Sequence, residues 1–215
     1  MPRKLYKGSK ITSRISSTNP NVGISVQNLT PGAVEDLVRR LQDTNVAFDQ
    51  PRVADGVATY YVDTEGGNLS AKALEYSRSA KGQVAMDSIE AAFVDSVFRE
   101  IDNLTGLQVI KTSSPDQAEF VIGKLADARY TNDRYSLKKG ALQMWFRENS
   151  AGLDDRERWW ITKEIAYDLA LWYVNGSTSY TTKDSVMCQD GSQFNGFYGF
   201  TPSDYNALIL TLGAA

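Results

Sequence analysis

The clearest pattern in the sequence is a segment, residues 159–173, in which apolar side chains recur at the spacing of an α-helix. The apolar residues that share one stripe are Ile161, Ile165, Leu169 and Trp172. Lys163 and Tyr167 are four residues apart, so they lie one above the other on a neighbouring face. The segment is therefore predicted to be an amphipathic helix, and the other predicted elements are placed around it.

Two more helices are predicted before this segment. Residues of about 31–43 follow a Thr30 cap and place Pro31 at the first helical position. A longer helix is predicted from Met86 to Ile101. Its expected buried stripe is Ile89, Phe93, Val97 and Ile101, joined by Ala92 and Val94.

Four segments rich in β-branched and aromatic residues are predicted to be strands. They are residues 57–62, 108–111, 118–123 and 141–147. A strand, a long helix and two further strands are typical of a βαβ sheet with a right-handed crossover. The order of elements therefore favours the α+β class, with a twisted mixed sheet of about four to five strands.

Composition narrows the class of protein. The chain has 215 residues, of which 42% are hydrophobic and 23% charged, which is typical of one soluble domain with an appendage. No apolar run is long enough for a transmembrane helix, and no apolar segment of the kind found in a signal peptide follows the charged N-terminus. Cys188 is the single cysteine. We therefore expect synthesis in the cytoplasm, without disulfides.

A resemblance to a known family begins in the central segment. Five of its positions lie on the zinc-binding template H-E-x-x-H-x-x-G-x-x-H. They are Lys163, Glu164, Tyr167, Ala170 and Tyr173, of which only the glutamate matches. Residues 184–187, which end at Met187, resemble the methionine turn of the same enzymes, and residues 200–208 resemble their last helix. The chain thus resembles a metzincin domain of the matrixin or serralysin type.

The resemblance implies a zinc site that this chain has lost. The sequence contains no histidine, whereas catalytic zinc sites are commonly built from two or three. Lysine and tyrosine stand where the resemblance places the ligands, and neither binds zinc well at neutral pH. Glu164 stands at the position of the general base, which has no zinc-bound water to activate here. We expect no metal and no other cofactor.

Ala170 stands where the family has a glycine that breaks the helix in a left-handed conformation. Alanine disfavours that break, so the helix is expected to continue toward Trp172 or Tyr173, or to exit differently. Our hypothesis for the vacated site is that tyrosine hydroxyls donate to carboxylates and that Lys163 supplies the positive charge. Lys163 and Glu164 point about 100° apart on a helix, so Lys163 is expected to pair with a different acid, such as Asp168 or one from the turn at residues 184–187; alternatively, it would extend into water.

The strand at residues 141–147 is a candidate binding element. The resemblance implies an antiparallel edge strand here that holds an extended peptide by added-strand hydrogen bonds. The residues expected to contact a partner are Leu142, Gln143, Met144 and Trp145. The alternative is an ordinary edge strand whose flanking charges discourage aggregation.

The N-terminal residues form a basic arm. Residues 1–34 contain five basic residues and no acidic one, which leaves 18 basic against 26 acidic residues, a net charge of −8, in the rest of the chain. The basic residues are Arg3, Lys4, Lys7, Lys10 and Arg14. We expect this arm to bind other protein subunits. Nucleic acid is disfavoured as a partner because the body is acidic and no basic–aromatic motif accompanies the arm.

These observations predict two regions, an arm with a short helix at residues 1–56 and a metzincin-like domain at residues 57–215. The domain is expected to have an antiparallel edge strand, two long helices and a C-terminal helix. The predicted function is that of an inactive structural or interaction subunit of a larger assembly. A phage virion component, such as a tail or capsid-associated protein, would satisfy these features. The alternative is a hydrolase or peptidase with an atypical mechanism.

Overall fold

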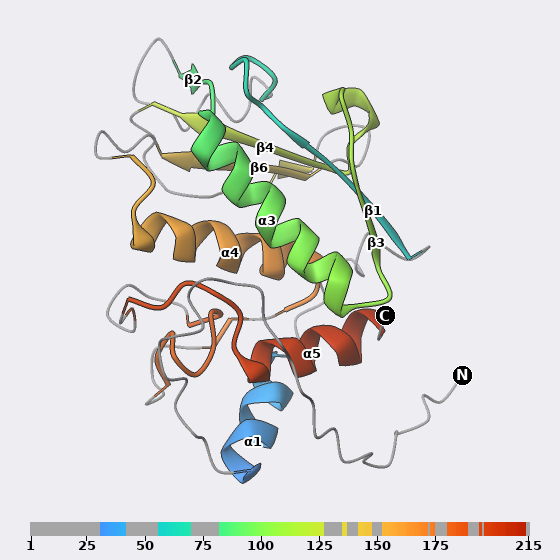
Figure 1. The fold of residues 1–215 in the computed structure, drawn as a ribbon, viewed down its shortest axis with the longest axis vertical. Helices are drawn as coiled ribbons and strands as arrows, with labels where there is room; N and C mark the ends of the chain where they lie inside the picture. Colours follow the sequence, from blue (N-terminus) through green and yellow to red (C-terminus); the bar gives the residue numbers. More distant parts are fainter. Residues whose placement is uncertain are drawn as a thin grey trace.

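The structure is a computed structural model. It describes residues 31–41, 56–69, 82–126, 135–136, 142–147, 152–171, 173–174, 180–188, 194 and 196–213. The basic residues of the predicted arm lie outside these ranges. Within them the chain forms a mixed α+β fold, as the sequence predicted, with a sheet at one side and helices packed against it (Figure 1).

The sheet has the strand order β3-β1-β4-β6-β5, with β2 paired to β4. The strands are β1 (Val57–Val62), β2 (Gln83–Val84), β3 (Gln108–Lys111), β4 (Phe120–Leu125), β5 (Tyr135–Ser136) and β6 (Leu142–Arg147). β3, β1, β4 and β6 are parallel to one another, whereas β5 is antiparallel to β6 and β2 is antiparallel to β4. A parallel core with a short antiparallel edge therefore makes up the mixed sheet.

The edge strand differs from the prediction. The sequence analysis assigned the antiparallel edge to residues 141–147, but β6 runs parallel to β4 along its whole length, from Leu142 opposite Phe120 to Arg147 opposite Leu125. The antiparallel edge strand is β5, which pairs with Leu142 and Gln143. A strand of two residues has no alternating pattern, so its sequence carries no signal that would have placed it.

The long helix α3 (Ser88–Leu104) begins with a capping box. The side chain of Asp87 accepts hydrogen bonds from the backbone of Ile89 and Glu90, and Glu90 accepts one from the backbone of Asp87. The expected stripe is partly wrong, because Ile89 is 65% exposed and Ala92 is exposed as well. The buried apolar residues of α3 are Ala91, Val94, Val97, Phe98 and Ile101. Successive helical residues are rotated by about 100°, which turns Ile89 about 120° away from Ile101.

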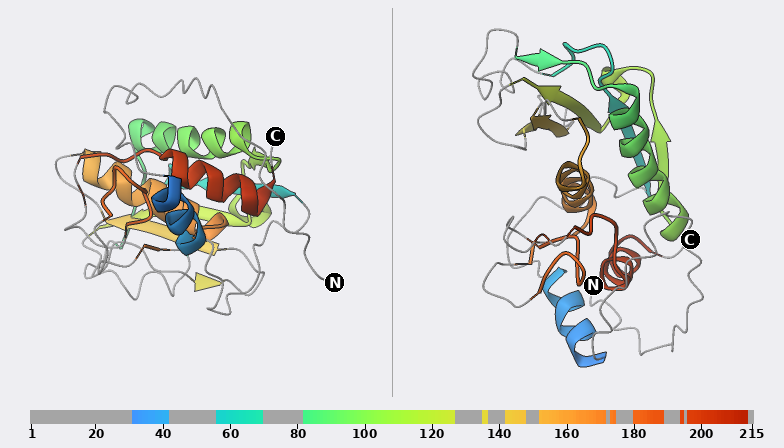
Figure 2. Two further views of the ribbon diagram at one scale, coloured as in Figure 1. Left: turned by 90° about the horizontal axis from the view of Figure 1, so that it is seen from below. Right: turned by 60° about the vertical axis from the view of Figure 1, so that its left-hand side comes forward.

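Three more helices complete the described fold. α4 (Asp155–Leu169) packs against α3 on one face of the sheet, and α5 (Pro202–Leu212) packs against both α3 and α1 (Pro31–Leu41) (Figures 1 and 2). α5 begins as predicted, with Thr201 as its N-cap and Pro202 in its first turn. None of the helices in the described ranges is long and apolar enough to cross a membrane.

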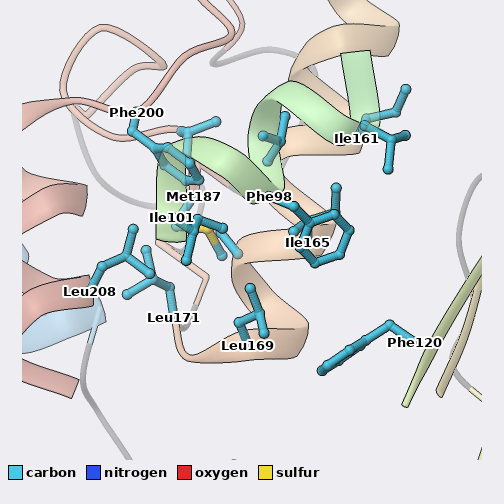
Figure 3. Packing of buried hydrophobic residues seen from close by; sticks show 14 of the residues in the cluster. Phe98, Ile101, Phe120, Ile161, Ile165, Leu169, Leu171, Met187, Phe200 and Leu208 are labelled. Carbon is cyan, nitrogen blue, oxygen red and sulfur yellow. The ribbon is translucent and has the colours of Figure 1, made fainter. Parts of the chain in front are cut away.

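The main hydrophobic core lies between the sheet and the helices (Figure 3). Alternate residues of β1 and β4 face it, and Tyr60 of β1 stacks on Phe98 of α3 with ring centroids 4.0 Å apart. Leu37 and Leu41 of α1 are fully buried in the same cluster. The helix that the sequence analysis grouped with the arm is thus packed into the core of the body.

The opposite face of the sheet has a smaller apolar cluster. It consists of Tyr61, Leu69, Ala118, Val121 and Leu125. Leu69, from the segment after β1, lies directly on Gly123 of β4, where an added Cβ would be 2.9 Å from the Leu69 Cγ atom. A side chain at position 123 would therefore displace this segment.

The aromatic residues of the C-terminal loops serve the packing of the body. Phe194 stacks on Trp159 of α4 with centroids 5.4 Å apart, and Tyr198 meets Phe93 of α3 edge-on at 5.9 Å. Phe197 and Phe200 are buried. The described members of this group therefore cover the helices.

Candidate functional site

The central helix α4 carries three of the five positions that were compared with the zinc template, Lys163, Glu164 and Tyr167, whereas Ala170 and Tyr173 follow the helix. Ile161, Ile165 and Leu169 are buried on its inner side, as predicted, whereas Trp172 lies outside the described residues. The helix starts at Asp155, capped by the Asp154 side chain, which is earlier than the apolar pattern indicated. A polar first turn explains the difference, because charged residues favour a helix start without adding to the apolar stripe.

The helix ends where the template has its glycine. α4 stops at Leu169, and the backbone N–H groups of Ala170 and Leu171 both donate to the Ala166 carbonyl at 2.9 Å. The helix therefore does not continue toward Trp172 or Tyr173 but exits differently, which was the other expected outcome. Ala170 has φ −165° and ψ −23°, so the chain leaves the helix without the left-handed conformation that would disfavour alanine. This exit allows Tyr173 to approach the helix again.

Glu164 is the centre of a buried cluster. Its side chain and that of Lys163 are 3% and 2% exposed, and the Lys163 Nζ atom lies 3.2 Å from Glu164 Oε1. The Tyr173 hydroxyl donates to Glu164 Oε2 at 2.6 Å. The structure thus brings three template positions together as the hypothesis expected, but Lys163 lies against Glu164, its sequence neighbour, which the hypothesis had not expected to be its partner. The alternative in which Lys163 extends into water is wrong.

Aromatic rings surround the Lys163 ammonium group. Its Nζ atom is 3.4 Å from the ring centroid of Trp160, 5.0 Å from that of Trp159 and 5.1 Å from that of Tyr173. Tyr167 stacks on Tyr173 with centroids 4.0 Å apart and ring planes 18° apart. Helical side chains tilt toward the N-terminus, which brings Lys163 back over residues three and four positions earlier. The sequence analysis missed both tryptophans, although this spacing could have identified them.

The methionine-turn-like segment lies beneath the start of α4. Met187 is fully buried in the main core. The Trp159 indole N–H donates to the Val186 carbonyl at 2.8 Å, and the Val174 N–H donates to the Met187 carbonyl at 2.8 Å. These bonds connect the turn to α4 and to the chain that follows Tyr173. Among the described residues, Met187 packs in the hydrophobic core.

Asp204 joins this turn to α5, and the sequence analysis did not identify it. Its carboxylate accepts hydrogen bonds from the Ser185 hydroxyl at 2.5 Å, the Val186 N–H at 3.0 Å and the N–H and hydroxyl of Thr201 at 2.8 and 2.9 Å. Burial raises the pKa of Asp204 to about 6, although these donors lower it. Thr201 and Asp204 form a capping box, and their spacing of three was the available sequence signal.

Two more carboxylates on α3 are engaged by side chains of other elements, the buried Glu90 and the half-buried Glu100. Both carboxylate oxygens of Glu90 accept hydrogen bonds from the Lys124 ammonium group, at 3.0 and 2.9 Å. The Glu90 side chain is 7% exposed and that of Lys124 is 10% exposed. Glu100 accepts a short hydrogen bond from the Tyr205 hydroxyl of α5, and burial raises the pKa of Glu100. Nothing in the sequence pairs these residues, because the partners are 34 and 105 positions apart.

The donor set around Glu164 does not fit a zinc ion. The ammonium of Lys163 has no lone pair and would repel a dication, and the Tyr173 hydroxyl is committed to Glu164. Across the described part of the chain, no three His, Cys, Asp or Glu side chains are grouped so that they could hold a metal ion. The chemistry of these positions is therefore that of a hydrogen-bonded ion pair.

The residues expected to bind partners are only partly placed. Leu142, Gln143, Met144 and Trp145 lie on β6, inside the sheet between β4 and β5, with β5 opposite the first two. Arg3, Lys4, Lys7, Lys10 and Arg14 lie outside the described residues. Their binding roles remain predictions.

Comparison with known proteins adds no family assignment. No protein-family model matches the chain, and no curated protein matches it significantly. The resemblance to metzincins therefore depends on the residues and the order of elements described above.

Proposed function

We propose that this protein is a catalytically inactive, metzincin-like subunit that works by binding other proteins in a larger assembly. The order of its elements supports the fold part of the proposal. Strand β1, the short strand β2, helix α3 and strands β3 and β4 are followed by the edge strand β5, the inner strand β6, helix α4, the turn at residues 184–187 and helix α5. This is the order that the sequence resemblance implies.

The single observation that best supports the proposed loss of activity is that both oxygens of the Glu164 carboxylate are engaged. A general base needs a lone pair directed at a water molecule within hydrogen-bond reach. One oxygen of Glu164 faces the Lys163 ammonium and the other accepts the Tyr173 hydroxyl, and the side chain is almost fully buried. The carboxylate is thus engaged by groups of its own chain at the positions where the resemblance places metal ligands.

The role in an assembly is supported by the charge distribution. A basic arm precedes an acidic body, and such an arm can bind an acidic surface on a neighbouring subunit. Once its catalytic chemistry is lost, a fold functions through its surfaces. A phage virion is the kind of assembly that we propose.

Metal content and peptidase activity test the first half of the proposal. Protein purified in the presence of zinc should contain no stoichiometric zinc by elemental analysis. It should also leave casein intact with or without a chelator. The matched variant Lys163→His/Tyr167→His/Tyr173→His restores the template histidines and serves as the comparison for metal uptake. Stoichiometric zinc in the wild-type protein, or casein cleavage that a chelator abolishes, would contradict the proposal.

Removal of residues 1–30 tests the second half. The truncated chain keeps every described helix and strand, so its melting temperature should stay within about 2 °C of that of the full chain. Its incorporation into the native assembly should be lost. A large fall in melting temperature would instead show that the arm packs on the body.

A further inference from the structure

The enclosure around Lys163 has the composition of a cation-binding site. Three aromatic rings, from Trp159, Trp160 and Tyr173, lie within 5.1 Å of one ammonium nitrogen. The Glu164 carboxylate supplies a countercharge at 3.2 Å. Aromatic faces attract cations through the ring quadrupole, and they do so most strongly when water is excluded, as it is around this side chain.

We propose that Trp159, Trp160, Glu164 and Tyr173 form a built binding site for a primary alkylammonium ion, which the native chain fills with its own Lys163. The site is assigned from its geometry alone, so it stands whether or not the proposed function is correct. Its ligand class follows from two contacts. The nitrogen lies 3.4 Å from the Trp160 ring centroid, and it is also within reach of a carboxylate oxygen that can accept an N–H hydrogen.

These contacts discriminate among cations. A primary ammonium group is small enough to approach one ring closely, and it can donate hydrogen bonds to Glu164. A quaternary ammonium ion has no N–H to donate, and its methyl groups keep the nitrogen farther from the ring. A neutral alcohol of the same length lacks the charge that both the rings and the carboxylate attract. The site is therefore expected to favour primary alkylammonium ions over both.

The walls of the site are held by contacts that do not involve Lys163. Trp159 is fixed by its hydrogen bond to the Val186 carbonyl and by stacking against Phe194. Tyr173 is fixed by its hydrogen bond to Glu164 and by stacking on Tyr167. The enclosure is therefore expected to persist when the lysine side chain is removed, which leaves a space for an external ligand.

Chemical rescue of Lys163→Ala tests the site. This substitution removes the three outer methylene groups and the ammonium, which together correspond to n-propylammonium. The melting temperature of the variant should rise by about 2–4 °C, in a saturable manner, as n-propylammonium chloride is added at constant ionic strength. Tetramethylammonium chloride and 1-propanol should give no saturable rise, and the wild-type protein should respond to none of the three.

The other buried lysine provides a matched control. Lys124 is also paired with a glutamate, but none of the described contacts brings an aromatic ring over its ammonium group. Lys124→Ala should therefore show no saturable response to n-propylammonium. An equal rescue of both variants, no rescue of Lys163→Ala, or equal rescue by tetramethylammonium would overturn the proposal.

If Lys163→Ala does not fold without a ligand, its refolding yield provides the test. Lys163→Ala is refolded from denaturant with and without n-propylammonium, and the folded fraction is measured by circular dichroism. A higher yield with the primary ammonium ion than with tetramethylammonium supports the site. Equal yields in all solutions overturn it.

Discussion

Two buried lysine–glutamate pairs lie in different structural settings in this protein. Lys124 of β4 meets Glu90 of α3, which lies 34 positions earlier in the chain, so this pair joins a strand to a helix. Lys163 and Glu164 are neighbours within α4, so their contact alone joins no two elements. Through Tyr173 the second pair also acts beyond its helix, because the Tyr173 hydroxyl connects the following segment to the Glu164 carboxylate.

The surroundings of the two pairs also differ. The Glu90 carboxylate accepts the Asp87 backbone N–H as well as the ammonium, so it also fixes the first turn of α3. Lys163 is enclosed by the rings of Trp159, Trp160 and Tyr173. A buried ion pair adds little net stability, because desolvation of the charges offsets their attraction, but removal of one partner is costly. The comparison shows that one lysine–glutamate pair can join two elements of the fold, whereas a similar pair can neutralise charge within a single helix.

The largest effect is expected from Lys124→Met. This change leaves the Glu90 carboxylate buried with only a backbone donor, and the free energy of unfolding should fall by about 3–5 kcal/mol. Denaturant unfolding followed by circular dichroism measures the loss. The double variant Glu90→Gln/Lys124→Met should recover part of it. A loss below about 1 kcal/mol would show that the pair does not join α3 to β4.

A smaller effect is expected from Lys163→Met. The Glu164 carboxylate keeps its Tyr173 hydroxyl, and the methionine side chain can pack on Trp160, so the expected loss is about 2–3 kcal/mol. A double-mutant cycle with Tyr173→Phe should give a coupling energy of at least about 0.5 kcal/mol, because both groups bond one carboxylate. Additive effects would show that the ammonium and the hydroxyl act independently.

The free energy of unfolding is expected to depend on pH through Asp204. The carboxylate of this residue accepts hydrogen bonds from hydroxyl and backbone N–H groups. Its pKa is about 6 in the folded chain and 3.8 without burial, so the folded state binds more protons between these values. Stability is therefore lost as the pH rises through 6, and unfolding at pH 5 should require about 1 kcal/mol more free energy than at pH 7. Asp204→Asn should remove this part of the pH profile. An unchanged profile would contradict the assignment.

The smallest effect on the free energy of unfolding is expected at Ile89, which lies next to the Lys124–Glu90 pair. Ile89 precedes Glu90 in α3, but its side chain is 65% exposed. Ile89→Ser should change the free energy of unfolding by no more than about 0.5 kcal/mol. Thermal or denaturant unfolding measures it. A loss above about 2 kcal/mol would show that this side chain is covered in the protein in solution.

Several elements could be predicted from the sequence because their signals are local. The apolar spacing of Ile161, Ile165 and Leu169 identified α4, and Thr201 with Pro202 identified the start of α5. Helical periodicity and end caps depend on residues within a few positions of one another. The α+β class followed from the order of such elements along the chain. The hypothesis that Lys163, Glu164 and Tyr173 belong to a charge cluster came instead from the resemblance to the zinc template.

Contacts between distant segments were decided only by the tertiary structure. β6 lies inside the sheet because β5 adds a two-residue edge, and Ile89 is exposed because the buried face of α3 is set by the layers around it. Lys124 contacts Glu90, 34 positions away in the chain. Asp204 contacts Ser185 and Val186, which are 19 and 18 positions away. Partner choice and strand register depend on which chain segments meet, and a single sequence carries no local signal for that encounter. The sequence determined by itself which segments are helical and which side chains are charged; the fold determined which of those charges are neutralised, and by what.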